Sequence, residues 1–186
     1  MSDKLGGDGR VPAAVTWGLL GAFAVHDLEE LVTMPSYNAR LVRRLRERYP
    51  RVPGRVWSAL EMDRVHAATA IGLMGALVGA AAADGARTGG RSGIYQTMLV
   101  GFGLHGVGHL AQSAAARGYT PGVLTSPGVV AFSLWAWRRL RRADVVREGD
   151  ARGLMSTAAL FPAVILGVHG AAHGVRWLAR RVRRGR

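Results

Sequence analysis

The sequence has no cysteine among its 186 residues. This absence excludes disulfide bonds, iron–sulfur clusters held only by cysteine, and metal sites built on thiolates. Acidic residues are also scarce, with 12 Asp and Glu against 25 Lys and Arg, which gives a formal net charge of +13. A metal site in this chain would therefore depend on histidine and a small number of carboxylates.

The N-terminus lacks the charged, apolar and small-residue pattern of a cleavable signal peptide, because residues 1–10 are polar and glycine-rich. We expect the first apolar segment to direct membrane insertion itself. Apolar residues make up 49% of the chain and gather in long blocks separated by arginine-rich stretches. This distribution leaves no room for a soluble domain.

Five apolar blocks approach or exceed the roughly 20 residues that a helix needs to cross a bilayer. They are Val11–Met34, Val56–Ala83, Tyr95–Ala116, Val123–Trp137 and Leu154–Leu178. The pattern predicts an all-α protein, a polytopic transmembrane bundle of four to five helices. A single transmembrane domain would cover residues 11–178, between a polar tail at 1–10 and a basic tail at 179–186.

An arginine-rich segment follows the first block. Pro35 predicts the end of the first helix, and the basic and apolar residues that alternate from Asn38 to Arg51 predict a short amphipathic helix on the membrane surface. Arginines beside apolar blocks are typical of segments that contact anionic lipids on the cytoplasmic side. We therefore expect a lipid bilayer and no nucleic acid as partner; the sequence does not specify an oligomeric state.

The basic residues also bear on topology. If the blocks alternate across the cell membrane, slightly more basic residues lie on the side of the C-terminus, which predicts a multi-pass protein with a cytoplasmic C-terminus.

All six histidines lie within predicted membrane helices: His26, His66, His105, His109, His169 and His173. Because successive helices run in opposite directions, these histidines and the neighbouring carboxylates fall in the same half of the bilayer. His105 and His109, like His169 and His173, are four residues apart and share one helix face. Ionisable groups at such depth are costly and usually functional.

Imidazoles and carboxylates that project inward from several helices can ligate iron, manganese or zinc. The candidate metal ligands are His26, Glu29, Glu30, Asp63, His66, His105, His109, His169 and His173. This set is large enough for two divalent ions. Gln112, one turn beyond His109, could support a ligand through a hydrogen bond.

Other interpretations of these residues remain open. Each histidine, taken alone, could be a packing residue bonded to a neighbouring carbonyl. Glu29 could instead reach the interface and pair with the arginines from Arg40 onward, and Asp27 could face the same basic surface.

Three short motifs together resemble the HXXEE family of small multi-spanning bacterial membrane proteins. They are His26-x-x-Glu29-Glu30, His105-x-x-x-His109-x-x-Gln112-Ser113 and Tyr119-x-Pro121-Gly122-x-x-Thr125-Ser126. The resemblance implies a membrane-embedded metal site at the first five of these positions, from His26 to His109, but no particular reaction. Many family members also carry an acidic pair in the second helix, where this chain has Glu61, Asp63 and Arg64.

These observations favour a metal-dependent enzyme that acts on a lipid-soluble substrate by oxidation or hydrolysis. Glu30 could serve as a ligand or as a general base, and the histidine-rich, cysteine-free ligand set favours a non-haem, dinuclear redox centre. Two alternatives are a haem protein with axial histidines from the third and fifth predicted helices, and a transporter of metal ions or protons.

Overall fold

A computed structural model describes residues 11–146, 163–175, 177–178 and 181 of the chain. The described residues form helices and no strand, so the predicted all-α class is confirmed. The helices are α1 (Ala13–Arg48), α2 (Gly54–Leu60), α3 (Arg64–Arg87), α4 (Gly93–Ala116), α5 (Ser126–Arg142) and the unlabelled helix Ala163–Val175. The polar tail at 1–10, nearly all of the basic tail at 179–186 and the first part of the last predicted helix lie outside the described residues.

Helix α1 runs unbroken through Pro35 for 36 residues, which corrects two predictions. The first helix does not end at Met34, and Asn38–Arg51 is not a separate surface helix. Contacts with the α2–α3 connection hold the second half of α1 in place: the Asn38 amide donates to the Leu60 carbonyl at 3.1 Å and accepts from the Met62 N–H at 2.8 Å. A proline inside a helix costs about 3 kcal/mol, because it removes one hydrogen bond and its ring clashes with the carbonyl four residues before it. The contacts of Asn38 favour continuation of the helix against this cost.

The second predicted helix is divided into α2 and α3 by the extended residues Glu61–Asp63. The Asp63 carboxylate caps α3, because it accepts a hydrogen bond of 2.8 Å from the His66 backbone N–H. Such a cap satisfies one of the free donors at a helix start and stabilises it by about 1 kcal/mol. Glu61 forms an ion pair of 3.0 Å with Arg46 on α1. The break therefore starts α3 at Arg64, so that His66 lies in its first turn.

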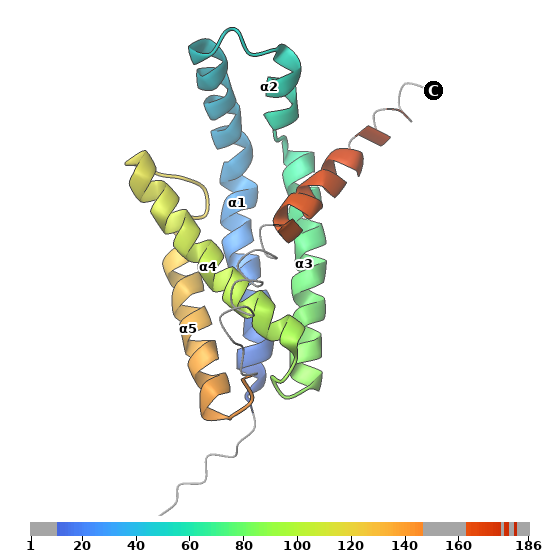
Figure 1. Ribbon diagram of the computed structural model, residues 1–186, viewed down its shortest axis with the longest axis vertical. Helices are drawn as coiled ribbons and strands as arrows, with labels where there is room; N and C mark the ends of the chain where they lie inside the picture. Colours follow the sequence, from blue (N-terminus) through green and yellow to red (C-terminus); the bar gives the residue numbers. More distant parts are fainter. Residues whose placement is uncertain (1–10, 147–162, 176, 179–180, 182–186) are drawn as a thin grey trace, which may run out of the picture.

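The hydrophobic core lies between α1, α3, α4 and α5, and α4 crosses α1 obliquely (Figure 1). Leu19 and Leu99 are fully buried in it, and the Tyr95 hydroxyl donates to the Val15 carbonyl. Further along α1 the core reaches Phe23, whose ring contacts Phe102 of α4 at a centroid distance of 6.3 Å. The next helical turns of α1 and α4 carry polar side chains, so the core positions them against each other.

Among the described residues, one helix is long and apolar enough to cross a membrane: α3, Arg64–Arg87. The helix Ala163–Val175 is apolar but shorter. The charged residues in the middle of α1 lower its mean hydropathy. The multi-pass bundle and the orientation of the chain therefore stay predictions.

Candidate metal site

Four side chains from two helices converge on one point: His26 and Glu30 from α1, and His105 and His109 from α4. One ligand atom of each residue lies within 4.8 Å of those of the other three. Each pair is four residues apart, so both members project from the same face of their helix. These four residues could hold a metal ion, and we call them the four-residue group.

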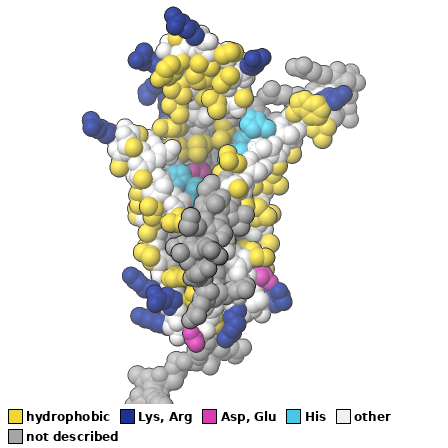
Figure 2. All heavy atoms as spheres, in the orientation of Figure 1, with side chains coloured by type: hydrophobic (Ala, Val, Ile, Leu, Met, Phe, Trp, Pro, Cys, Tyr) yellow, Lys and Arg dark blue, Asp and Glu magenta, His cyan; other side chains and the backbone are white. Residues whose placement is uncertain are grey.

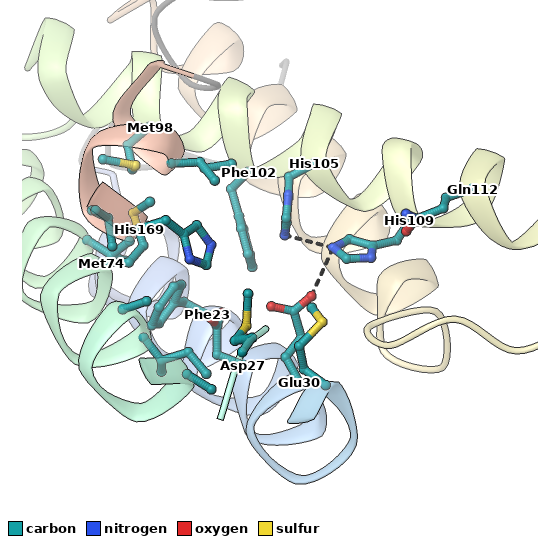
Figure 3. Close-up of a pocket in the computed structure, with 18 residues that line it drawn as sticks. Phe23, Asp27, Glu30, Met74, Met98, Phe102, His105, His109, Gln112 and His169 are labelled. Atoms are coloured by element: carbon teal, nitrogen blue, oxygen red, sulfur yellow. Dashed lines mark hydrogen bonds and ion pairs between the residues drawn. The ribbon is translucent and has the colours of Figure 1, made fainter. Parts of the chain in front are cut away.

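The contacts within the group are close. His109 Nε2 lies 2.9 Å from His105 Nε2 and 3.2 Å from Glu30 Oε1 (Figure 3). The His26 ring lies 5.2 Å and 5.0 Å, between centroids, from the rings of His105 and His109. With metal–nitrogen bonds of about 2.0–2.1 Å, ligands around a tetrahedral ion would lie roughly 3.3 Å apart. The two separations at His109 Nε2 are close to this value, and the ligand atoms of all four residues lie within 4.8 Å of one another.

A cavity of about 270 Å³ opens beside the group and has a largely apolar wall. Glu30, His105 and His109 line it on one side, and His169 lies on the other side (Figure 3). Most of the remaining lining comes from apolar side chains: Phe23, Met34, Met62, Ala67, Ala70, Ile71, Met74, Val78, Met98, Phe102, Ile165 and Val168. The polar group therefore faces a space suited to an apolar molecule.

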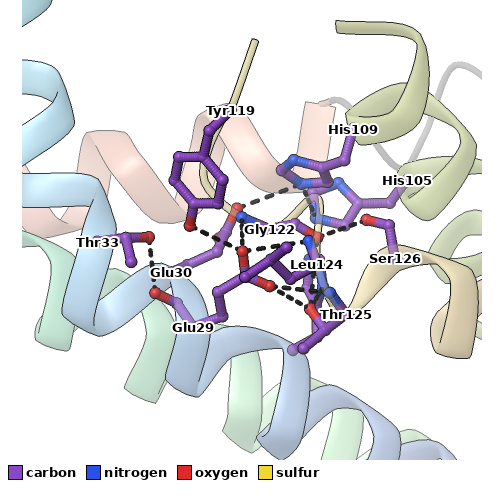
Figure 4. A network of polar contacts seen from close by, with 11 residues as sticks. Glu29, Glu30, Thr33, His105, His109, Tyr119, Gly122, Leu124, Thr125 and Ser126 are labelled. Atoms are coloured by element: carbon purple, nitrogen blue, oxygen red, sulfur yellow. Dashed lines mark hydrogen bonds and ion pairs between the residues drawn. The ribbon is translucent and has the colours of Figure 1, made fainter. Parts of the chain in front are cut away.

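The loop between α4 and α5 covers the back of the group and is bonded to Glu29. Figure 4 shows the Glu29 carboxylate facing this loop. One oxygen accepts from the Tyr119 hydroxyl at 2.8 Å and from the backbone N–H groups of Gly122 and Leu124 at 3.1 and 3.3 Å. The other accepts from the backbone N–H and hydroxyl of Thr125 at 2.9 and 2.8 Å. Glu29 thus lies outside the four-residue group and contacts the loop, not the arginine surface.

Electrostatics favour the same arrangement at Tyr119. Burial raises the pKa of the Tyr119 phenol, and the adjacent Glu29 carboxylate raises it further. The phenol therefore stays protonated and donates to Glu29.

Gly122 allows the loop to approach the ligands. Its φ of +85° is readily adopted only by glycine. A Cβ atom there would lie 2.8 Å from His109 Nδ1 and 3.0 Å from His26 Cε1. The loop therefore packs directly against two members of the group.

The remaining predicted ligands lie elsewhere. His66, His169 and His173 form a second cluster between α3 and the helix Ala163–Val175: His66 Nε2 lies 3.0 Å from His169 Nδ1, and the rings of His66 and His173 are 4.3 Å apart between centroids. Asp63 caps α3 beside this cluster. Gln112 lines the cavity but is exposed. The structure thus brings together four of the nine predicted ligands and places three others in a separate cluster.

Asp27 is a residue whose position the sequence did not predict. Its side chain is only 8% exposed and lines the cavity next to Glu30, so it does not face the basic surface. Thr125, which bonds to both Glu29 and His26, was also missed as part of the site. The place of Thr125 in the third short motif was the one feature of the sequence that could have indicated its role. For Asp27, its position directly after His26 did not indicate which way its side chain points.

A family comparison matches residues 17–136 to the family described as "Protein of unknown function with HXXEE motif". The match spans the two elements that form the four-residue group and the loop that covers it. The chain belongs to the HXXEE family. No curated protein and no solved structure matches the chain. In this HXXEE protein the motif residues His26, Glu29 and Glu30 all lie at the site.

Proposed function

We propose that this HXXEE protein is a membrane enzyme that uses one metal ion, held by the four-residue group, to oxidise or hydrolyse a lipid-soluble substrate. The observation that carries the proposal is the convergence of three imidazoles and a carboxylate at the edge of an apolar cavity. Polar groups concentrated at one side of an otherwise apolar pocket are typical of small-molecule sites.

The donor set fits zinc, iron or manganese. Three imidazole nitrogens and one carboxylate oxygen are common ligands of these ions, and softer metals would prefer thiolates, which the chain does not have. An ion bound there would supply Lewis acidity or activate dioxygen. Glu30 both contacts His109 and faces the cavity, so it is the residue placed to ligate the ion or to accept a proton from the substrate.

The shape and lining of the cavity support an apolar substrate. Met34, Met62, Met74 and Met98 all contribute to its wall. Methionine side chains are flexible and adapt to irregular apolar molecules. A substrate chain lying along this wall would reach Glu30 and His105 at the polar side.

The surface supports a location in a membrane. Val25, Leu28 and Val32 form an outward stripe on α1, and each is more than 60% exposed. Figure 2 shows hydrophobic side chains along both flanks of the visible face and toward its upper part, with most Lys and Arg side chains near the two ends of the long axis. Exposed apolar area of this extent in a basic protein is expected where lipid, not water, is the neighbour.

The geometry is unfavourable for the haem alternative. Axial histidines lie on opposite faces of a macrocycle, whereas His105 and His109 contact each other at 2.9 Å. The predicted axial partners His169 and His173 belong to the other cluster, where His169 contacts His66. A transporter would require polar groups along the whole membrane thickness, and the polar side chains at this cavity lie mainly on one side of it.

The test is to express the full chain in a bacterial host, compare the host's lipid extracts by mass spectrometry, and measure the metal content of the purified protein. We expect Glu30→Gln to abolish both the metal and any lipid product. Glu61→Gln, a matched change in an exposed ion pair with Arg46, should leave both unchanged. Full metal content and unchanged product in Glu30→Gln would refute the proposal.

A further inference from the structure

The two adjacent glutamates of the HXXEE motif face different partners. Glu30 points to the cavity and His109, whereas Glu29 points to the α4–α5 loop (Figure 4). We propose that Glu29 and Thr125 are positioning residues that hold His26 in the tautomer with the proton on Nδ1, so that its Nε2 lone pair faces the four-residue group. This proposal rests on the proposed metal site and deepens it.

The direction of the hydrogen bonds can be assigned from the donors present. Glu29 Oε2 lies 2.8 Å from Thr125 Oγ1, and a carboxylate can only accept, so the threonine hydroxyl donates to it. A hydroxyl has one proton. The contact of the same hydroxyl with the Gly122 carbonyl is longer, at 3.4 Å, and the charged acceptor is preferred.

The orientation of Thr125 then determines the tautomer of His26. His26 Nδ1 lies 2.8 Å from Thr125 Oγ1, whose proton is already directed at Glu29. Two lone pairs at this distance would repel, so Nδ1 must carry a proton and donate it. A neutral imidazole has one N–H, and Nε2 is therefore left with a lone pair.

The surroundings of His26 Nε2 leave its lone pair available to bind a metal ion. The side chain is fully buried, and its Nε2 has no hydrogen-bond partner among the described residues. Its ring packs edge-on against Phe102 and lies next to His105 and His109. A buried acceptor without a donor is costly, and a metal ion would satisfy it.

Glu29 itself is unsuited to be a ligand. A carboxylate has about four lone-pair sites, and five donors from Tyr119, Gly122, Leu124 and Thr125 already contact the two Glu29 oxygens. Four of those five bonds come from positions named in the third short motif of the chain. The third motif thus forms the loop that hydrogen-bonds to Glu29 and places the Thr125 hydroxyl next to His26 Nδ1.

The first test reads the tautomer directly. The nitrogen-15 chemical shifts of His26 would be measured in the metal-free, full-length protein in detergent, where they distinguish a protonated from an unprotonated ring nitrogen. We expect Nδ1–H in the wild type and in Thr125→Ser, which keeps the hydroxyl. Thr125→Val has the same shape without the hydroxyl, and we expect it to lose the single Nδ1–H form.

A matched control separates the effect of the Thr125 hydroxyl on His26 from general loosening of the loop. The Ser126 hydroxyl donates to the Gly122 carbonyl at 2.7 Å but does not contact His26. Ser126→Ala should therefore leave the tautomer unchanged. An Nε2–H tautomer in the wild type, or the wild-type tautomer retained in folded Thr125→Val, would overturn the proposal.

The second test measures zinc affinity by competition with a chelator. Loss of a hydrogen-bond partner behind a ligating histidine typically lowers metal affinity about 10–100-fold. We expect a loss of this size in Thr125→Val and near-normal affinity in Thr125→Ser. If the wild type shows the Nδ1–H tautomer and Thr125→Val loses it, yet the wild type itself binds no zinc, the positioning of His26 stands and the proposed metal-dependent function falls. Equal affinity in Thr125→Val and the wild type would overturn the positioning role.

Discussion

The two histidine clusters of this protein contain the same kind of side chain but are held differently. In the four-residue group, three histidines meet a carboxylate, and a loop bonded to Glu29 fixes them from behind. In the second cluster, His66 is buried but His173 is exposed. The helix that carries His173 packs on α3 through Ala172 and Val168 against Ala70. Figure 2 shows histidine atoms in two separate places on the visible face. Histidines that the sequence predicts at similar depth therefore do not make one site; supporting contacts distinguish the two clusters.

The largest expected difference between the clusters is in metal binding. His109→Ala removes a buried member of the four-residue group, and its affinity loss should exceed the roughly 10–100-fold caused by losing an outer hydrogen-bond partner. His169→Ala is the matched change in the second cluster and should alter zinc affinity by less than about threefold. Competition with a chelator measures both. Equal losses in the two variants would mean that both clusters hold the ion.

This comparison also shows how far the sequence could predict the site. The i, i+4 spacing correctly placed His105 and His109 on one face. The family resemblance implied five ligands, of which four converge and Glu29 instead contacts the α4–α5 loop. Sequence alone could not say which helix faces pair, so it merged His66, His169 and His173 with them. Periodicity describes the face of one helix, whereas pairing depends on packing between helices.

The fold was predictable to a similar extent. Apolar blocks indicated most of the helices, but the continuation of α1 past Pro35 and the break at Glu61–Asp63 depend on tertiary contacts. Asn38 and Arg46 make those contacts with residues far along the chain. The role of Glu29 was hidden for the same reason, because its partners lie more than 85 residues away. Long-range polar contacts leave no periodic pattern in a sequence.

A smaller effect, on the stability of the fold, is expected when a side chain at Gly122 forces the α4–α5 loop away from the four-residue group. Gly122→Ala adds a Cβ at 2.8 Å from His109 and a side chain at positive φ, which should destabilise the fold by about 1–3 kcal/mol. Gly108→Ala is the control on α4: its Cβ would meet nothing within 4 Å, and it should be neutral or stabilise the helix by up to about 1 kcal/mol. Unfolding midpoints in detergent give both values. Equal midpoints would show that the loop does not pack on the ligands as described.

The smallest effect is expected at the exposed edge of the second cluster. His173→Ala removes an exposed side chain, and exposed substitutions usually change the free energy of unfolding by less than about 0.5 kcal/mol. The same unfolding measurement serves as the check. A destabilisation above about 2 kcal/mol would show that the second cluster is held as firmly as the first.

The metal content of the purified full-length chain, combined with X-ray absorption spectroscopy of the bound ion, tests the central claim most directly. The account predicts one non-haem ion per chain, with about three imidazoles and one carboxylate around it, and the same signal when His66, His169 and His173 are all replaced by alanine. No bound ion, a second ion, or a signal lost in that triple variant would contradict it.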